Sequence, residues 1–299
     1  MSLPTLLITG ATGKQGGAVI DALRQSQLNY KILALTRNAS SPAAKQLLST
    51  PNLTLVEGDT TKPAPIFAAH GPIHGVFGVT ALGPKNGDEE AQAEPLIDAS
   101  ISNGVNHFVF TSVDRGGPDR SPHNPTEIAH FRMKHRIEEY LTTHAKDSRM
   151  TWTVLRPTAF MDNFEPGMPG KVFASMWAGV GDKPLQLISI RDIGLFAVKA
   201  FADPERYHEK AISLAGDALT VEQAKEVFRN TMGYDMPVTY RLVGYTAEMV
   251  MTEIGKMFRW FKTEGYGADI AGLRREEPRL QDFGTWLRES SGFAKAGAQ

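Results

Sequence analysis

The 299-residue chain contains no cysteine. This absence excludes disulfide bonds, thiolate nucleophiles and metal sites built on thiolates. Histidines and carboxylates do not occur at the spacings of metal ligands either, so no metal site is predicted. The sequence therefore points away from cysteine chemistry and from metal chemistry.

Strong charge and long hydrophobic runs are also missing. The 32 Lys and Arg residues balance 33 Asp and Glu residues, so the formal net charge is −1, and no block of like charge occurs. Direct nucleic-acid binding is therefore not predicted. No run of about 18 uncharged apolar residues occurs and the start of the chain lacks a basic segment, so neither a membrane span nor a signal peptide is predicted. We expect a protein of the cytoplasm, with the nucleus as an alternative.

Apolar segments alternate with amphipathic segments through the first half of the chain. Continuous apolar runs such as LLIT, KILAL and HFVF predict strands, and the amphipathic segments between them predict helices. Strands of this kind, separated by helices, form a parallel sheet that is covered on both faces. With right-handed crossovers the predicted fold class is α/β, a doubly wound parallel sheet (Rossmann) with a smaller C-terminal α/β lobe.

Two domains are expected from this pattern. Residues 1–155, continued by about 185–215, are assigned to a dinucleotide-binding Rossmann domain. Residues 156–184 and 216–299 are assigned to a smaller lobe for a substrate or a partner. The division rests on where the chain leaves the regular strand and helix alternation and where it returns to it.

The second half of the chain is less regular. Residues 164–181 are rich in glycine, methionine and aromatic residues, which suits the wall of an apolar pocket and equally suits a loop packed on the sheet. A helix is expected from Thr246. Asp192 is expected to cap the start of another helix, because a carboxylate can accept the unpaired N–H groups there.

The segment GATGKQGG lies between the first predicted strand and the first predicted helix. Its glycines permit a tight turn and let a pyrophosphate approach the backbone N–H groups at the helix N-terminus. The spacing differs from the GxGxxG of most dinucleotide dehydrogenases, so the position between strand and helix carries the prediction, and a mere tight turn is the alternative. The predicted cofactor-binding residues of this loop are Gly10, Thr12, Gly13, Lys14, Gln15 and Gly16.

Arg37 lies at the end of the second predicted strand, about 20 residues after the last glycine, where NAD-specific folds carry an acidic residue. A carboxylate would repel a 2′-phosphate whereas a guanidinium pairs with it, so NADP(H) is predicted as the cofactor. A solvated position is the alternative for Arg37 and for Lys14. Asp59 follows the third strand, where a carboxylate can accept from the adenine amino group, and it equally suits a turn.

Segments spread over nearly the whole chain resemble a known family: GATGKQGG, ALTR, VEGDTTKP, FVFTSV, HFRMKHRIEEYL, LRPTAFMDNF and MFRWFKTEGYGADI. Together they resemble the NmrA-like branch of the atypical short-chain dehydrogenase/reductases. The resemblance implies an NADP(H)-binding Rossmann domain with a smaller lobe. Some members reduce quinones or aromatic natural products, and others act as redox-responsive regulators without known turnover. The further cofactor-binding residues assigned with it are Thr60, Thr80, Thr158 and Phe160.

The predicted helix after Pro125 departs from ordinary short-chain dehydrogenases, which carry a tyrosine four residues before a lysine. Here His130 takes the place of the tyrosine, and Lys134 by resemblance holds the nicotinamide ribose hydroxyls. Ser112 matches the family's serine that orients a substrate carbonyl. An imidazole can act as a general acid near neutral pH, so these three residues are the catalytic candidates. The alternatives are an idle site, a solvated or packed His130, and a Ser112 that caps a loop.

Two functions of different class follow from these residues. The first is an NADPH-dependent reductase that passes hydride to a small, largely apolar quinone, enone, imine or ketone. The second is a catalytically weak redox sensor whose affinity for a protein partner depends on bound NADP(H). The missing tyrosine favours the sensor. The retained Lys134 and the apolar second lobe favour the reductase, which is the prediction.

Overall fold

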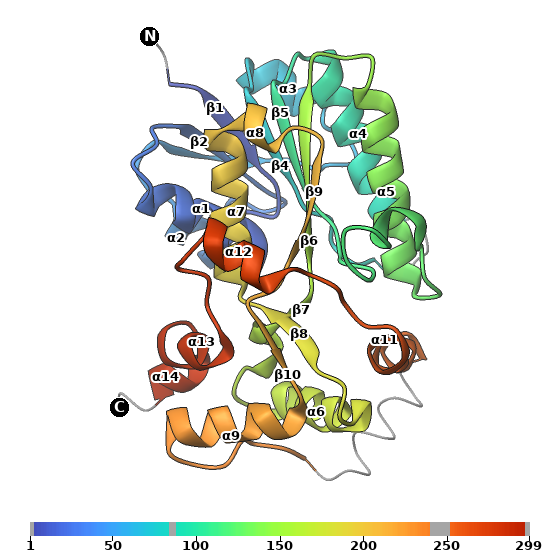
Figure 1. Ribbon diagram of the computed structural model, residues 1–299. Coiled ribbons are helices and arrows are strands. Elements are labelled where there is room, and N and C mark those ends of the chain that lie inside the picture. Colours follow the sequence, from blue (N-terminus) through green and yellow to red (C-terminus); the bar gives the residue numbers. More distant parts are fainter. Residues whose placement is uncertain (1–2, 84–87, 240–251, 297–299) are drawn as a thin grey trace. The chain divides into compact units, whose positions relative to one another are not determined.

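The computed structural model describes residues 3–83, 88–239 and 252–296 (Figure 1). The chain forms two compact units. The first unit comprises Met1–Val113, His130–Arg156 and Ile193–Ile212, and the second comprises Asp114–Ala129, Pro157–Asp192 and Ser213–Gln299. Residues 114–129, which the sequence analysis kept in the dinucleotide-binding domain, belong to the second unit.

The first unit is built on a seven-stranded sheet in the order β3-β2-β1-β4-β5-β6-β9. The neighbouring pairs from β3 through β6 are parallel. The chain order changes direction between β1 and β4, and ligands of such sheets bind beyond the carboxyl ends of the strands at this point. The strands are β1 (Thr5–Ile8), β2 (Lys31–Thr36), β3 (Leu53–Glu57), β4 (Gly75–Gly78), β5 (His107–Thr111), β6 (Thr151–Pro157) and β9 (Lys210–Leu214).

Helices cover both faces of this sheet, so the predicted α/β fold class is confirmed (Figure 1). Helices α3, α4 and α5 share one buried apolar cluster with the strands, to which they contribute Phe67, Ile97 and Leu141. Helices α1 and α7 touch each other on the other face, where a Cβ on Gly194 would lie 2.4 Å from the carbonyl oxygen of Ala18. The helices of the unit are α1 (Lys14–Gln25), α2 (Pro42–Leu47), α3 (Ala64–His70), α4 (Asp88–Ser102), α5 (Ala129–Ala145), most of α7 (Ile190–Ala202) and α8 (Pro204–Tyr207).

Helix α3 is an element that the sequence analysis did not predict. It has 7 residues and begins between Pro63 and Pro65. A helix of two turns gives too little periodicity to be distinguished from a loop, and proline is common both in loops and in the first turn of helices. Its burial of Ile66 and Phe67 against the sheet supplies the stability that the isolated segment lacks.

The second unit contains a three-stranded sheet in the order β10-β8-β7. Residues 164–181 are mostly helix α6 rather than a loop, and Trp177 is fully buried with its ring 5.2 Å from that of Phe164. Helix α11 begins at Thr252, and the expected helix start at Thr246 lies outside the described residues. The elements are β7 (Ala159–Phe160), β8 (Leu185–Ile188), β10 (Asp217–Leu219), α6 (Met168–Trp177), α9 (Val221–Met232), α11 (Thr252–Thr263), α12 (Ile270–Glu276), α13 (Phe283–Glu289) and α14 (Gly292–Ala296).

The cap of helix α7 differs from the prediction. The helix begins at Ile190, whose N–H donates to Oδ2 of Asp162 at 3.1 Å. Asp192 is instead fully buried and accepts from the Gln281 N–H at 2.8 Å and from Arg191 at 3.0 Å. Burial raises the pKa of Asp192 to about 6. The prediction that Asp192 caps this helix was therefore wrong, because a residue distant in sequence supplies the acceptor.

Candidate functional site

The glycine-rich segment forms the turn between β1 and α1. Gly10 has a φ of +57°, and a Cβ there would lie 2.6 Å from Cγ1 of Val79. A Cβ on Gly16 would lie 2.3 Å from the carbonyl oxygen of Gly10 and 2.6 Å from that of Thr9. Glycine at these two positions lets the helix start close against the strand end, as dinucleotide-binding loops require.

The N-terminus of α1 has the properties of an anion site. Its N-cap residue is Gly13, no side chain of the described residues caps it, and its first turn contains no acidic residue. Thr12, Gly13 and Lys14 are exposed there. The first N–H groups of a helix together with its dipole favour a negative charge at this position. The loop therefore fits the diphosphate of a dinucleotide.

Two hydrogen-bonded contacts join this loop to neighbouring strand ends. Oγ1 of Thr9 accepts from the N–H of Val79 at 2.8 Å, which ties the end of β1 to the end of β4. The half-buried Gln15 accepts from Oγ1 of Thr111, the last residue of β5, at 2.7 Å. The carboxyl ends of β1, β4 and β5 thus form one connected edge, and Thr80 lies on it directly after Val79.

Arg37 and Asp59 follow the carboxyl ends of β2 and β3. Arg37 is exposed, and its guanidinium makes no hydrogen bond or ion pair with any other described residue. Asp59 is exposed as well, and its Oδ1 accepts from the N–H of Thr61 at 2.9 Å. That bond is typical of a carboxylate that shapes a turn, which is the alternative that the sequence left open for Asp59. Thr60 lies half-buried in the same turn.

Lys134 is anchored by three acceptors. Its Nζ donates to Oγ1 of Thr80 at 2.6 Å and to the carbonyl oxygen of Thr111 at 3.2 Å, and it lies 3.1 Å from Oε2 of Glu89. The same Oε2 accepts a short hydrogen bond from the Thr80 hydroxyl. The ammonium also lies 5.0 Å from the ring centre of Phe110. The structure therefore brings Thr80 and Lys134 together, as a shared cofactor site requires.

Glu89 is not among the site residues predicted from the sequence. This carboxylate is in the first turn of α4, where acidic residues are common because they favour the helix dipole. It differs from its neighbours only in being buried, with 1% of the residue exposed. A sequence offers no signal for that difference.

Ser112 belongs to a buried ion-pair network. Its hydroxyl donates a short hydrogen bond to Oε1 of Glu138, and Arg156 donates to both oxygens of the same carboxylate, at 2.7 Å from Nη2 to Oε2. The exposed fractions of the three residues are 5%, 5% and 4%. Hydrogen bonding of this kind offsets the cost of burying both charges. The arrangement supports a structural role for Ser112, which was one of its two interpretations.

His130 lies in the first turn of α5, one turn before Lys134. The residue is half-buried, and its ring meets the ring of Phe131 edge-on at 4.7 Å. The one-turn spacing places both side chains on the same face of the helix, as a proton donor beside Lys134 requires. A histidine that is only packed against its neighbours would make the same ring contact. The geometry is therefore compatible with His130 as a proton donor and as a packed side chain.

The last two predicted cofactor residues lie in the second unit. Thr158 is 3% exposed, and both its N–H and its hydroxyl donate to the carbonyl oxygen of Leu214 at 3.0 Å. Phe160 is half-buried in β7, where it pairs with Ile188 of β8. Phe160 is thus held by the three-stranded sheet, and Thr158 by the last residue of β9.

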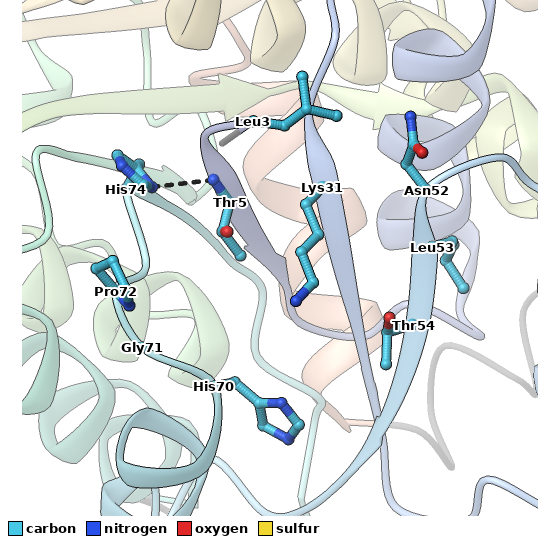
Figure 2. Close-up of a pocket in the computed structure, with 10 residues that line it drawn as sticks. All are labelled: Leu3, Thr5, Lys31, Asn52, Leu53, Thr54, His70, Gly71, Pro72 and His74. Atoms are coloured by element: carbon cyan, nitrogen blue, oxygen red, sulfur yellow. Dashed lines mark hydrogen bonds between the residues drawn. The ribbon is translucent and has the colours of Figure 1, made fainter. Parts of the chain in front are cut away.

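A cavity of about 520 Å³ lies at the opposite edge of the first unit's sheet, where β1, β2 and β3 begin (Figure 2). Lys31, Thr54 and His70 surround it, and Nδ1 of His74 accepts from the N–H of Thr5 at 2.9 Å. Its lining contains none of the predicted site residues. The cavity is therefore separate from the glycine loop.

These features define a class of protein. A glycine turn between β1 and α1, at the change of strand order and beside an uncapped helix N-terminus, is the arrangement of a Rossmann-type dinucleotide-binding protein. The model of the NmrA-like family matches residues 3–281. The chain therefore belongs to the NmrA-like family, and the resemblance noted in the sequence is confirmed.

Relatives and solved structures agree with this placement. NAD(P)H azoreductase of Xenophilus azovorans is 27% identical over 254 residues, which cover 84% of this chain and 81% of the relative. The crystal structure of NmrA, a negative transcriptional regulator, in complex with NADP superposes with a TM-score of 0.73 at 18% identity, covering 100% and 98% of the two chains. Citrobacter sp. triphenylmethane reductase complexed with NADP(H) also gives 0.73 at 18% identity, covering 97% and 100%.

NmrA has been crystallised with NAD as well, at a TM-score of 0.74 and 18% identity over 100% of this chain and 99% of that one. The family is one of NAD(P)-binding oxidoreductases, and the regulator NmrA shares its fold. Within the described ranges of this chain, no helix is long and apolar enough to cross a membrane. Those ranges also contain no group of three His, Asp or Glu side chains able to hold a metal ion.

Proposed function

We propose that this protein is an NADPH-dependent reductase that passes hydride to a small apolar quinone, enone, imine or ketone. One observation carries the proposal: the uncapped N-terminus of α1 and the Thr80–Lys134 pair lie along the same edge of one sheet. A dinucleotide extends along such an edge, with its diphosphate at the glycine loop. By their names, the azoreductase relative reduces azo compounds and the reductase of the same fold reduces triphenylmethanes, which supports a small apolar acceptor here.

The residues of the first unit fit separate parts of NADP(H). The glycine loop would take the diphosphate, Arg37 the 2′-phosphate, and Lys134 the nicotinamide ribose. Arg37 supports NADP(H) over NAD(H) because its exposed guanidinium can form bidentate, charge-assisted hydrogen bonds with a phosphate. Thr158 and Phe160 of the second unit are proposed for the nicotinamide end on the resemblance alone.

The bound cofactor would supply the hydride, and the protein would supply binding, orientation and a proton. Hydride addition to a carbonyl, imine or quinone leaves a negative charge on oxygen or nitrogen, and a proton must follow. His130 is the proposed donor, with water as the alternative, because an imidazole exchanges protons near neutral pH. The Lys134 ammonium would stabilise the developing anion electrostatically.

A redox-sensing function is the second candidate. It is favoured by the absence of the tyrosine at position 130 and by the engagement of Ser112 with Glu138, which leave only Lys134 of the usual catalytic set in a binding role. In this case NADP(H) occupancy would control affinity for a protein partner. The regulator NmrA has the same fold, which is compatible with this candidate.

The experiment has two readouts. Binding of NADPH and NADH is measured by titration calorimetry, and loss of nicotinamide absorbance is measured with a panel of quinones, enones, imines, ketones and azo compounds. A reductase binds NADPH and consumes it with at least one acceptor. If NADPH binds but no acceptor of the panel is reduced, the redox-sensing function would take the place of the reductase. If neither NADPH nor NADH binds, both functions are refuted.

A further inference from the structure

Glu89 is a buried carboxylate that contacts Lys134 and Thr80 of the proposed cofactor site. Its side chain is 1% exposed, its Oε2 lies 3.1 Å from the ammonium of Lys134, and the hydroxyl of Thr80 donates to the same oxygen. The two charged residues come from α4 and α5 of the first unit. A carboxylate is this fully buried only when it is paired, so the position of Glu89 is tied to that of Lys134.

The hydrogen bonds of Lys134 show why an anchor matters. An ammonium has three N–H groups, and the protein supplies three acceptors: Thr80, Thr111 and Glu89. To bind Lys134, a ribose hydroxyl must therefore displace one of these three acceptors from its N–H group. The bond to the neutral carbonyl oxygen of Thr111, at 3.2 Å, is longer than the bond to Thr80 and, unlike the contact with Glu89, does not join opposite charges, so it is the one most readily exchanged. Glu89 and Thr80 then continue to hold the ammonium in place.

The other carboxylate oxygen lacks a donor. Oε1 of Glu89 is buried and accepts no hydrogen bond from any described residue. A buried acceptor without a partner is costly and rare, and it points to a group that arrives with a ligand. The ribose hydroxyls are such groups, because each hydroxyl can both accept and donate. Lys134 can satisfy their acceptor side, and Oε1 can satisfy a donor side.

We infer that Glu89 is a binding residue for the nicotinamide ribose: it anchors Lys134 through Oε2 and accepts a ribose hydroxyl through Oε1. The inference rests on the proposed NADP(H) function and adds a residue to it. It assigns the contact to a Glu–Lys pair rather than to the lysine alone. Glu89 would not touch the adenosine, 2′-phosphate or diphosphate parts of the cofactor.

The test compares Glu89→Gln with Glu90→Gln. Glu90 is the next residue of α4, and its Oε1 forms a surface ion pair with Nη1 of Arg136 at 3.2 Å. Both changes remove one negative charge from the same helix turn, so effects on net charge and helix dipole are matched. Each variant is titrated with NADPH and with 2′-phospho-ADP, which keeps the adenosine, 2′-phosphate and diphosphate but lacks the nicotinamide riboside.

We expect Glu89→Gln to bind NADPH about tenfold to hundredfold more weakly than the wild type, the usual effect of a lost hydrogen bond to a charged group. Its affinity for 2′-phospho-ADP should stay within about twofold, and Glu90→Gln should change neither affinity. Glu89→Asp keeps the charge but shortens the side chain by one methylene, so it should weaken binding of NADPH and leave binding of 2′-phospho-ADP unchanged. It takes the place of Glu89→Gln if that variant does not fold.

Unchanged NADPH affinity in Glu89→Gln, or in Glu89→Asp where only that variant folds, would overturn the inference. Equal losses for NADPH and 2′-phospho-ADP would also overturn it, because they would show a general structural effect. If the wild type binds 2′-phospho-ADP and NADPH equally well, the nicotinamide ribose contributes no binding contact. This result would overturn the inference about Glu89 but not the proposed function. A wild-type protein that binds neither would overturn the proposed function and this inference with it.

Discussion

Gly16 and Gly17 are neighbours in α1, but only Gly17 has room for a side chain. A Cβ on Gly16 would lie 2.3 Å from the carbonyl oxygen of Gly10, whereas the nearest atom to a Cβ on Gly17 is the carbonyl oxygen of Ala11 at 3.7 Å. A backbone oxygen cannot swing aside as the end of a side chain can. Gly16→Ala must therefore push α1 away from the loop, and Gly17→Ala provides a matched control.

The two substitutions should have opposite effects on stability. Alanine is favoured over glycine in a helix by about 1 kcal/mol, so Gly17→Ala should raise the free energy of unfolding by up to that amount. Gly16→Ala has the same gain, but overpacking costs about 1–3 kcal/mol. The net change for Gly16→Ala is a loss of roughly 0–2 kcal/mol. The two variants should therefore differ by about 1–3 kcal/mol.

Cofactor affinity should separate the variants further. A displaced α1 no longer directs its N-terminal N–H groups at a diphosphate, so Gly16→Ala should bind NADPH at least about tenfold more weakly, and Gly17→Ala should bind it as the wild type does. Urea unfolding and titration calorimetry measure the two quantities. Equal stabilities of the two variants, or unchanged NADPH affinity in Gly16→Ala, would refute the close contact between helix and strand as the reason for glycine.

Three further predictions concern charge. Arg37→Asp should shift preference from NADPH toward NADH in binding titrations, and an unchanged NADPH affinity would remove Arg37 from the site. Burial, with a smaller effect of His208, lowers the pKa of His107 to about 4, so below the ordinary value of 6.5 the unfolded chain binds the extra proton. Between pH 7 and pH 4.5 the free energy of unfolding of the wild type should therefore fall by roughly 2–3 kcal/mol relative to that of His107→Gln. Urea unfolding that gives the same difference between the two proteins at both pH values would contradict this. Asp192 has the opposite sign: with a pKa raised by burial to about 6, its stabilising contribution is present below pH 3.8 and lost as pH rises through 6. Between pH 4.5 and pH 7 the free energy of unfolding of the wild type, measured with urea, should fall by about 2 kcal/mol relative to that of Asp192→Asn. The same difference between the two proteins at both pH values would exclude the raised pKa of Asp192.

Most of the first unit and its glycine loop could be predicted from local patterns. Continuous apolar strands, amphipathic helices and a glycine turn between them are properties of neighbouring residues, so the order of elements and the positions of Gly10, Gly16 and Arg37 followed without any knowledge of distant contacts. Helix α3 was missed because 7 residues hold too little periodicity. The cap of α7 was misassigned because its acceptor, Asp162, is distant in sequence.

The partners of the candidate site residues were decided only by the tertiary structure. Lys134 pairs with Glu89 from another helix, and Ser112 donates to Glu138 beside Arg156 from another strand. A pattern of residue types shows which side chains can carry a charge, but packing alone shows which charges are buried and must therefore be paired. The sequence indicated the glycine loop as the candidate site for a dinucleotide. The fold determined that Lys134 is held by a buried carboxylate and that the hydroxyl of Ser112 is engaged in the core.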